Sequence, residues 1–146
     1  MPRASRKFKP GDFYIDCALH PCLCTKADAW ELEGISLVDG SQRFCSIRNC
    51  GPQKVSRTAA FKWKKEGPPE DQKQKVLNLK KNGWASMDDW WNRGSYKMKV
   101  GDLVVDIEDK SDDDLRLMCG EMTAQEMRTA KAVLNWCKSK LVGMFS

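Results

Sequence analysis

The first third of the chain alternates apolar and polar residues with a period of two. Phe13, Ile15 and Cys17 are spaced in this way, and a strand turns successive side chains to opposite faces. Asp39-Gly40 is a dipeptide that accepts positive φ and favours a tight hairpin turn. The alternation and the turns predict strands at residues 13–17, 21–28, 30–37 and 42–47.

The gaps between these strands are too short for a crossover helix, which excludes a parallel sheet. Gly34 interrupts the alternation of the third strand, so we expect a bulge there. Short antiparallel strands joined by tight turns are typical of a small curled sheet or an SH3-like barrel.

After residue 52 the apolar period becomes helical. We expect Ser56, Ser86 and Ser111 to cap helices, because a serine side chain at that position accepts a hydrogen bond from the first turn. One further strand, completing the sheet, is expected at residues 99–107. The predicted helices cover residues 56–65, 70–81, a short segment after residue 86, residues 111–118 and the chain from residue 123.

The last helix has the clearest pattern. Thr123 and Glu126 form a capping box, and an apolar stripe follows at three- and four-residue steps. Such a stripe packs on a sheet more often than on a membrane surface. Its members are Met127, Ala130, Leu134, Cys137 and Leu141.

The elements predict an α+β fold with an SH3-like β-barrel or curled sheet followed by a helical C-terminal half. We divide the chain into a basic tail at residues 1–10, a β module with the first helix at residues 11–66, and a helical region with one strand at residues 67–146. The two larger parts are expected to pack as one compact unit, because the length suits a single domain.

Composition narrows the class of protein. The 41% of hydrophobic residues and 31% of charged residues exclude both a membrane protein and a disordered chain. The first ten residues are basic and lack the apolar core of a secretory signal, so we expect a cytoplasmic protein. Thiols stay reduced there, and the seven cysteines then indicate metal ligands or buried thiols before disulfides.

The net charge of +5 is spread unevenly. Residues 1–83 hold sixteen Lys and Arg against nine Asp and Glu, whereas residues 84–122 hold five against ten. This split predicts a basic face that attracts polyanions, although a simply solvated surface would give the same count. The residues expected on this face, besides the basic tail, are Arg57, Lys62, Lys64 and Lys65.

Five cysteines and the only histidine cluster between residues 17 and 50. On an extended strand His20 and Cys24 project the same way, with Cys17 just upstream. With Cys45 or Cys50 they supply the four N and S ligands of a structural zinc site. The spacing is not that of a zinc finger, and small β units also bury cysteines as compact apolar residues.

A series of short motifs runs through this part of the chain: GD-x-Y at residue 11, DC at 16, HP at 20, CT at 24, GISL-x-DGS at 34, CS at 45 and CG at 50. With these motifs, residues 11–66 resemble a small module of uncharacterised bacterial proteins. Cys22 departs from the pattern, which has an aliphatic residue there, whereas Cys17, His20, Cys24, Cys45 and Cys50 match it. The resemblance implies a fold unit and a ligand set without supplying an activity.

Three tryptophans, Trp84, Trp90 and Trp91, lie within eight residues. Exposed, they would form a stacking platform for bases or an anchor for a protein partner. We expect two of the three to be buried, because aromatic area dominates small cores.

These patterns predict a non-catalytic cytoplasmic binding protein that engages nucleic acid or a nucleic-acid-handling protein complex. One alternative is a phage or mobile-element inhibitor that acts by protein–protein contact. Another is an enzyme with a nucleophilic Cys17, a basic His20 and an orienting Asp16, although such groups are seldom neighbours in sequence. The chain has no phosphate loop, dinucleotide fingerprint, metalloprotease motif or serine elbow.

Overall fold

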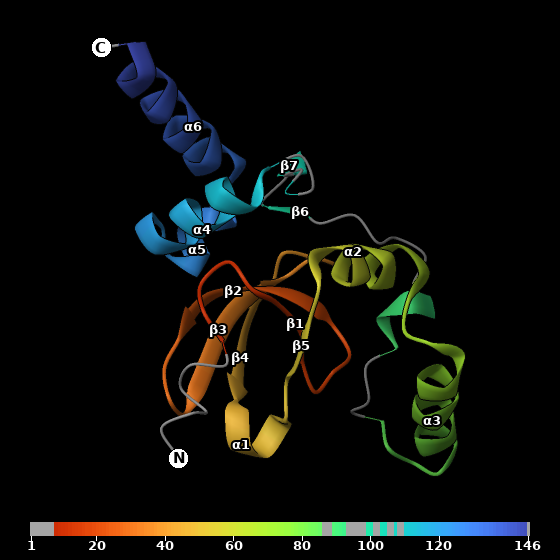
Figure 1. Ribbon diagram of the computed structural model, residues 1–146. Helices are drawn as coiled ribbons and strands as arrows, with labels where there is room; N and C mark the ends of the chain where they lie inside the picture. The colour runs from red at the N-terminus through yellow and green to blue at the C-terminus, as the bar shows by residue number, and fades with distance from the viewer. Residues whose placement is uncertain are drawn as a thin grey trace.

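The structure is a computed structural model of the chain, and it describes residues 8–85, 89–92, 99–100, 103–104, 107 and 110–145. Its centre is an antiparallel sheet with the strand order β4-β3-β2-β1-β5 (Figure 1). The sheet confirms the predicted antiparallel strands. In the predicted Asp39-Gly40 turn, only Gly40 has a positive φ. The strands are β1 (Phe13–Ile15), β2 (Pro21–Ala27), β3 (Glu31–Ser36), β4 (Gln42–Ser46) and β5 (Gln53–Val55).

A short helix, α1 (Ile47–Cys50), carries the chain from one edge of the sheet to the other. Ser46 caps it by accepting a hydrogen bond from the Asn49 amide, and Gly51 ends it with a φ of 59°, which favours glycine. The edge strands β4 and β5 are not paired with each other, so the sheet is open. The α+β class is confirmed, and the closed SH3-like barrel stays a prediction.

Two helices follow the sheet as predicted. Ser56 caps α2 (Arg57–Glu66) through the Ala59 amide, and α3 (Glu70–Lys81) begins with two acids and ends with two lysines, the order that the helix dipole favours. The 3₁₀ helix η2 (Trp90–Asn92) comes next. The predicted cap Ser86 lies outside the described residues.

The prediction of one strand at residues 99–107 is wrong. Here β6 (Lys99–Val100) and β7 (Leu103–Val104) form an antiparallel hairpin, and within the described ranges these two strands pair only with each other. The Gly101-Asp102 pair, which interrupts the apolar pattern in the sequence, separates the two strands.

The C-terminal part is helical. Ser111 caps α4 (Asp112–Glu121) as predicted, but the helix continues through Gly120 instead of ending there. The capping box of Thr123 and Glu126 is confirmed at the start of α5 (Ala124–Met127). The last helix, α6 (Ala130–Phe145), extends away from the sheet toward its C-terminal end (Figure 1).

The predicted apolar stripe is confirmed only in part, because the helix is interrupted between α5 and α6. Met127 is buried and Cys137 packs against the same core cluster, whereas Leu134 is exposed. The side chains of Ala130 and Leu141 lie outside the described part.

The Thr129 hydroxyl accepts a hydrogen bond from the Ala132 amide and starts a new helix. The break rotates the helical face, so Val133 is buried whereas Leu134 is 56% exposed.

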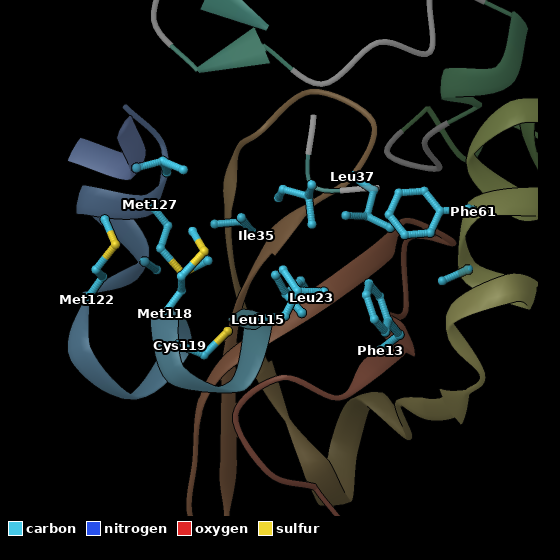
Figure 2. Close-up of a cluster of buried hydrophobic side chains, with 14 residues drawn as sticks. Phe13, Leu23, Ile35, Leu37, Phe61, Leu115, Met118, Cys119, Met122 and Met127 are labelled. Carbon is cyan, nitrogen blue, oxygen red and sulfur yellow. The ribbon is translucent and has the colours of Figure 1, made fainter. Parts of the chain in front are cut away.

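One face of the sheet packs against helices and forms the main core (Figure 2). We call it the helix-covered face. Phe13 meets Phe61 of α2 edge to face, with ring centroids 5.6 Å apart. Leu115 and Met118 of α4 and Met127 of α5 cover the rest of the face. The strand and loop residues of this face are Phe13, Leu23, Ile35 and Leu37.

The opposite face, which we call the sulfur-lined face, is built of Tyr14, Cys22, Cys24, Leu32 and Cys45, with Phe8 packed against them. A Cβ on Gly34 would lie 2.5 Å from the carbonyl oxygen of Leu23 and 2.6 Å from the Tyr14 hydroxyl. Glycine is therefore required by the close approach of these groups. The bulge expected at Gly34 lies instead in the neighbouring strand, where the register shifts between Cys24 and Lys26.

A third cluster joins the β1–β2 loop to the helices. The Leu19 carbonyl oxygen accepts hydrogen bonds from the indole nitrogens of Trp63, at 2.9 Å, and Trp90, at 3.0 Å. Leu19 has a φ of 64°, an uncommon conformation for a residue with a side chain. Trp90 and Trp91 are buried here with Val76, so the expected burial of two of the three tryptophans is confirmed.

Candidate functional site

The structure brings together three of the five predicted metal ligands. Cys17 comes from the β1–β2 loop, Cys45 from β4 and Cys50 from the end of α1. Cys17 and Cys45 both influence the pKa of Cys50, and Cys50 packs against the cluster of buried residues that contains Cys45. Cys17 is exposed, Cys50 is half-buried and Cys45 is buried. We call these three residues the thiol trio.

The three thiols of the trio differ in how readily they lose a proton. Burial acts to raise the pKa of Cys50, but hydrogen bonds from Cys45 and Cys17 outweigh it and lower the pKa below the ordinary value. Burial, followed by the hydrogen bond to Cys50, raises the pKa of both Cys17 and Cys45. A negative charge on the trio is therefore most stable on Cys50, where two thiols can donate to it.

His20 is engaged elsewhere. Its ring is buried, with Nδ1 2.7 Å from the Ser36 hydroxyl oxygen and the ring centroid 5.8 Å from that of Trp90. Ser36 also accepts a hydrogen bond from the Val38 amide, which ties the imidazole to the β3–β4 turn. Sequence reasoning missed this contact, because nothing in the spacing of Ser36 identifies it as a partner.

Cys24 shares the sulfur-lined face with Cys45, but its thiol is bonded to the backbone. Its thiol donates to the Lys26 carbonyl oxygen at 3.5 Å. Burial and the neighbouring Cys119 raise the pKa of Cys24 to about 12. Among the residues that the structure describes, no three His, Cys, Asp or Glu side chains are arranged to hold a metal ion. The zinc site predicted from the sequence stays a prediction.

Asp16 organises the loop that carries Cys17 and His20. Its Oδ1 accepts hydrogen bonds from the Ala18 and His20 amides, at 3.0 and 2.9 Å. Its Oδ2 accepts from Arg43 Nε of β4 at 2.8 Å. The carboxylate thus fixes the loop against the sheet.

Two of the four predicted basic residues of α2, Arg57 and Lys64, make contacts within the protein. Arg57 bonds Asp112 of α4 at 2.9 Å and the Ile107 carbonyl oxygen at 3.3 Å, so it fastens two elements together. Lys64 lies 5.7 Å from the centre of the Phe61 ring. Lys62 and Lys65 are exposed on the same helix.

Helix α3 extends this basic surface, which sequence reasoning did not include. Only Val76 of α3 is buried, and Leu77 is 37% exposed one turn before Lys81. Lys75 is also exposed, on another side of the helix. A shallow pocket follows the Leu77 side of the helix and is lined by Gln74, Leu77, Lys80 and Lys81. The signal was present in the sequence, since α3 has a weak apolar stripe and four lysines.

Trp84 lies just beyond α3 and is 58% exposed, so it is the member of the tryptophan group that is left on the surface. Trp90 and Trp91 belong to the core, which removes them from any contact surface. Residues 57–84 contain eight Lys and Arg and three Asp and Glu. We call residues 57–84 the α2–α3 surface. The excess of positive over negative residues in this segment equals the net charge of the whole chain, +5.

Some lysines of the α2–α3 surface form ion pairs and others do not. Lys73 pairs with Glu70 and Lys80 pairs with Asp89. Lys62, Lys75 and Lys81 form no ion pair with any residue in the described ranges. The unneutralised charge is therefore concentrated on the outer sides of α2 and α3.

No family model, curated protein or solved structure matches the chain. In the parts that the structure describes, none of the helices is long and apolar enough to cross a membrane.

Proposed function

We propose that this protein is a non-catalytic binding protein that engages nucleic acid through the α2–α3 surface. The observation that carries the proposal is the composition of α3 and its end. The helix buries only Val76, whereas Lys75, Lys81 and the indole of Trp84 remain at the surface.

Each part of this surface suits a polynucleotide. Lysine side chains neutralise phosphates and release their counterions, which gives affinity without sequence preference. An exposed tryptophan stacks on unpaired bases, so Trp84 favours single-stranded over fully paired ligands. Figure 1 shows α3 on the side of the molecule away from α5 and α6, where a long ligand meets no obstruction from those helices.

The β module fits this role as a support. Its strand order, with a short helix before the final strand, is the order expected of an SH3-like barrel, and we propose that classification for it. We also propose a cytoplasmic location, where the seven free cysteines would remain reduced.

A second candidate function is protein–protein contact, either with a nucleic-acid-handling complex or as a mobile-element inhibitor. The exposed side chains of Leu77 and Leu79 favour it, because aliphatic groups can pack against a protein partner but gain little from contact with charged phosphates. The affinity for nucleic acid should fall steeply with salt concentration, whereas a contact through leucine side chains need not.

The test is binding of a fluorescent single-stranded oligonucleotide at several salt concentrations. We expect the logarithm of the affinity to fall linearly with the logarithm of salt concentration. The charge reversal Lys75→Glu/Lys81→Glu should weaken binding by about tenfold or more at low salt. Trp84→Ala should cost about 1–3 kcal/mol of binding free energy.

A matched control is Lys131→Glu/Lys138→Glu, which reverses two exposed charges on α6. This variant has the same net charge as the first and should bind nearly as well as the wild type. Equal losses in both variants would indicate a general charge effect. No affinity for the oligonucleotide at low salt would refute the proposal and favour a protein partner.

A further inference from the structure

Strand β4 is an edge of the central sheet. Within the described ranges it pairs only with β3, and apart from α1 no other described helix or strand makes more than marginal contact with it. Natural edge strands are usually protected from further pairing by a proline, a bulge or an outward lysine. β4 has no proline, its register with β3 is unbroken, and its only cation, Arg43, is bound to Asp16. The strand itself therefore carries none of the usual protection.

The hydrogen bonds at the two ends of β4 define which of its backbone groups face outward. They run from the Ser36 amide to the Ser41 carbonyl oxygen and from the Ile47 amide to the Trp30 carbonyl oxygen, both at 2.9 Å. In an antiparallel pair, bonded and non-bonded residues alternate along each strand. The alternation turns the amide and carbonyl groups of Gln42 and Phe44 away from β3. An incoming strand can pair with these groups.

The side chains beside this edge favour a cation. Phe44 is 70% exposed and pairs across the sheet with Glu33, whose carboxylate is held by the neutral side-chain amide of Gln42. A small pocket of about 80 Å³ beside this pair is lined by Lys26, Asp28, Glu31, Leu32, Glu33 and Phe44. Three carboxylates against one lysine leave the pocket negative, and an aromatic ring attracts a cation to its face. A lysine or arginine side chain therefore suits this pocket better than an apolar or acidic one.

Trp30 adds a second exposed aromatic group at the end of the same edge. It is 69% exposed, and its amide is held by Asp28 Oδ1 at 2.7 Å. Its carbonyl bond to Ile47 places it beside the end of β4. Side chains alternate between the faces of a sheet, which puts Trp30 and Phe44 on opposite faces. A strand added to β4 would therefore have an aromatic group on each side.

We propose that the β4 edge binds an extended segment of a partner protein, with one lysine or arginine side chain of that segment in the pocket beside Phe44. A second copy of this chain is a poorer occupant, because the only cation of its own β4, Arg43, is already bound to Asp16 at 2.8 Å. The edge consists of other residues than the α2–α3 surface, so this inference does not rest on nucleic-acid binding.

The experiment follows the amide signals of the isotope-labelled full chain by NMR while a peptide is added. The probes are two eight-residue peptides, one alternating valine with lysine and the other alternating valine with glutamate. We expect the lysine peptide to shift the signals of Gln42 and Phe44 and to slow the exchange of their amide hydrogens with solvent, because both amides become bonded. The glutamate peptide should leave both signals unchanged.

A third peptide tests the backbone pairing separately from the charge. A residue directly opposite Phe44 in an antiparallel pair exchanges backbone bonds with it and shares its face. The lysine peptide with methyl groups on its lysine amide nitrogens keeps every charge but cannot donate these bonds. It should therefore lose most of the affinity.

Two variants locate the contact. Phe44→Ala and Glu31→Lys should each weaken binding of the lysine peptide about two- to fivefold, the range expected for an exposed cation–π contact or ion pair. Both residues are exposed, so the variants should fold, which circular dichroism checks. The matched controls are Leu117→Ala, an exposed apolar residue of α4, and Asp71→Lys, an exposed acid of α3, and neither should change the affinity.

Four results would overturn the proposal. One is a lysine peptide that leaves the Gln42 and Phe44 signals unchanged at millimolar concentration. Another is equal affinity for the lysine and glutamate peptides. The third is an affinity that neither Phe44→Ala nor Glu31→Lys alters. The fourth is a dimer of the free protein that protects the Gln42 and Phe44 amides, because a second copy would then occupy the edge.

Discussion

The two faces of the central sheet are packed in opposite ways. The helix-covered face is filled by large aliphatic, aromatic and Met side chains that interlock with α2, α4 and α5 (Figure 2). The sulfur-lined face combines three cysteines with larger side chains, and its backbone and side chains approach until a single methyl group no longer fits at Gly34. Substitutions that remove atoms should therefore lower the stability most on the helix-covered face, and substitutions that add atoms should lower it most on the sulfur-lined face.

The largest expected effect is on the helix-covered face. Leu23→Ala removes a fully buried side chain at the centre of the core and leaves a cavity between the sheet and α4. We expect a loss of about 2–5 kcal/mol in the free energy of unfolding, measured by urea denaturation. Cys22→Ala removes an equally buried but smaller group from the other face and should cost clearly less. Equal losses would contradict the comparison.

The next effect is on the sulfur-lined face. Gly34→Ala adds one methyl group against the Leu23 carbonyl oxygen, which is backbone and cannot turn aside. The strands must separate, and we expect a loss of about 1–3 kcal/mol in the free energy of unfolding. Thermal denaturation followed by circular dichroism would measure it.

Two controls sharpen this result. Gly120→Ala adds the same methyl group where nothing lies within 4 Å, on a helix that it should slightly stabilise. Tyr14→Phe removes the other group near Gly34, a buried hydroxyl without a hydrogen-bond partner, and should be nearly neutral. A Gly34→Ala variant as stable as Gly120→Ala would show that the face is less tightly packed than the structure indicates.

The sequence predicted the parts of the fold that depend on local interactions. Ser56, Ser111 and Thr123 act as caps because each side chain bonds an amide three residues ahead, within one turn. The strands followed from a period of two. The break before α6 was missed because Thr129 is as compatible with the interior of that helix as with its start.

The candidate site was predicted in part, for a physical reason. Treating residues 20–24 as extended, with Cys17 just upstream, placed His20 with the cysteines. The chain instead turns at Leu19, where a positive φ redirects the backbone, and β2 begins only at Pro21. His20 therefore meets Ser36, whereas Cys17 meets Cys50. Such a turn depends on tertiary hydrogen bonds to the Leu19 carbonyl oxygen, which no local pattern reveals.

The smallest expected effect concerns the border of the sulfur-lined face, where the trio lies. Because the pKa of Cys50 is lowered and those of Cys17 and Cys45 are raised, Cys50 should keep its thiolate to lower pH than its two neighbours. On folding, the lowered pKa of Cys50 adds stability above the ordinary thiol pKa, which is lost as the pH falls through the lowered value. The raised pKa values of the other two act in the opposite direction and reduce stability as the pH rises above the ordinary thiol pKa, so the stability of the folded protein does not report on Cys50 alone.

Alkylation kinetics isolate the Cys50 contribution. We expect the rate of Cys50 modification by iodoacetamide, followed by mass spectrometry, to rise at lower pH in the wild type than in Cys45→Ala, which lacks one of the two donors. Cys137, half-buried and outside the trio, provides an internal reference that should react alike in both proteins. If the two Cys50 profiles coincide, the Cys45 thiol does not stabilise the Cys50 thiolate, and Cys17 and the Ser46 backbone must account for the lowered pKa.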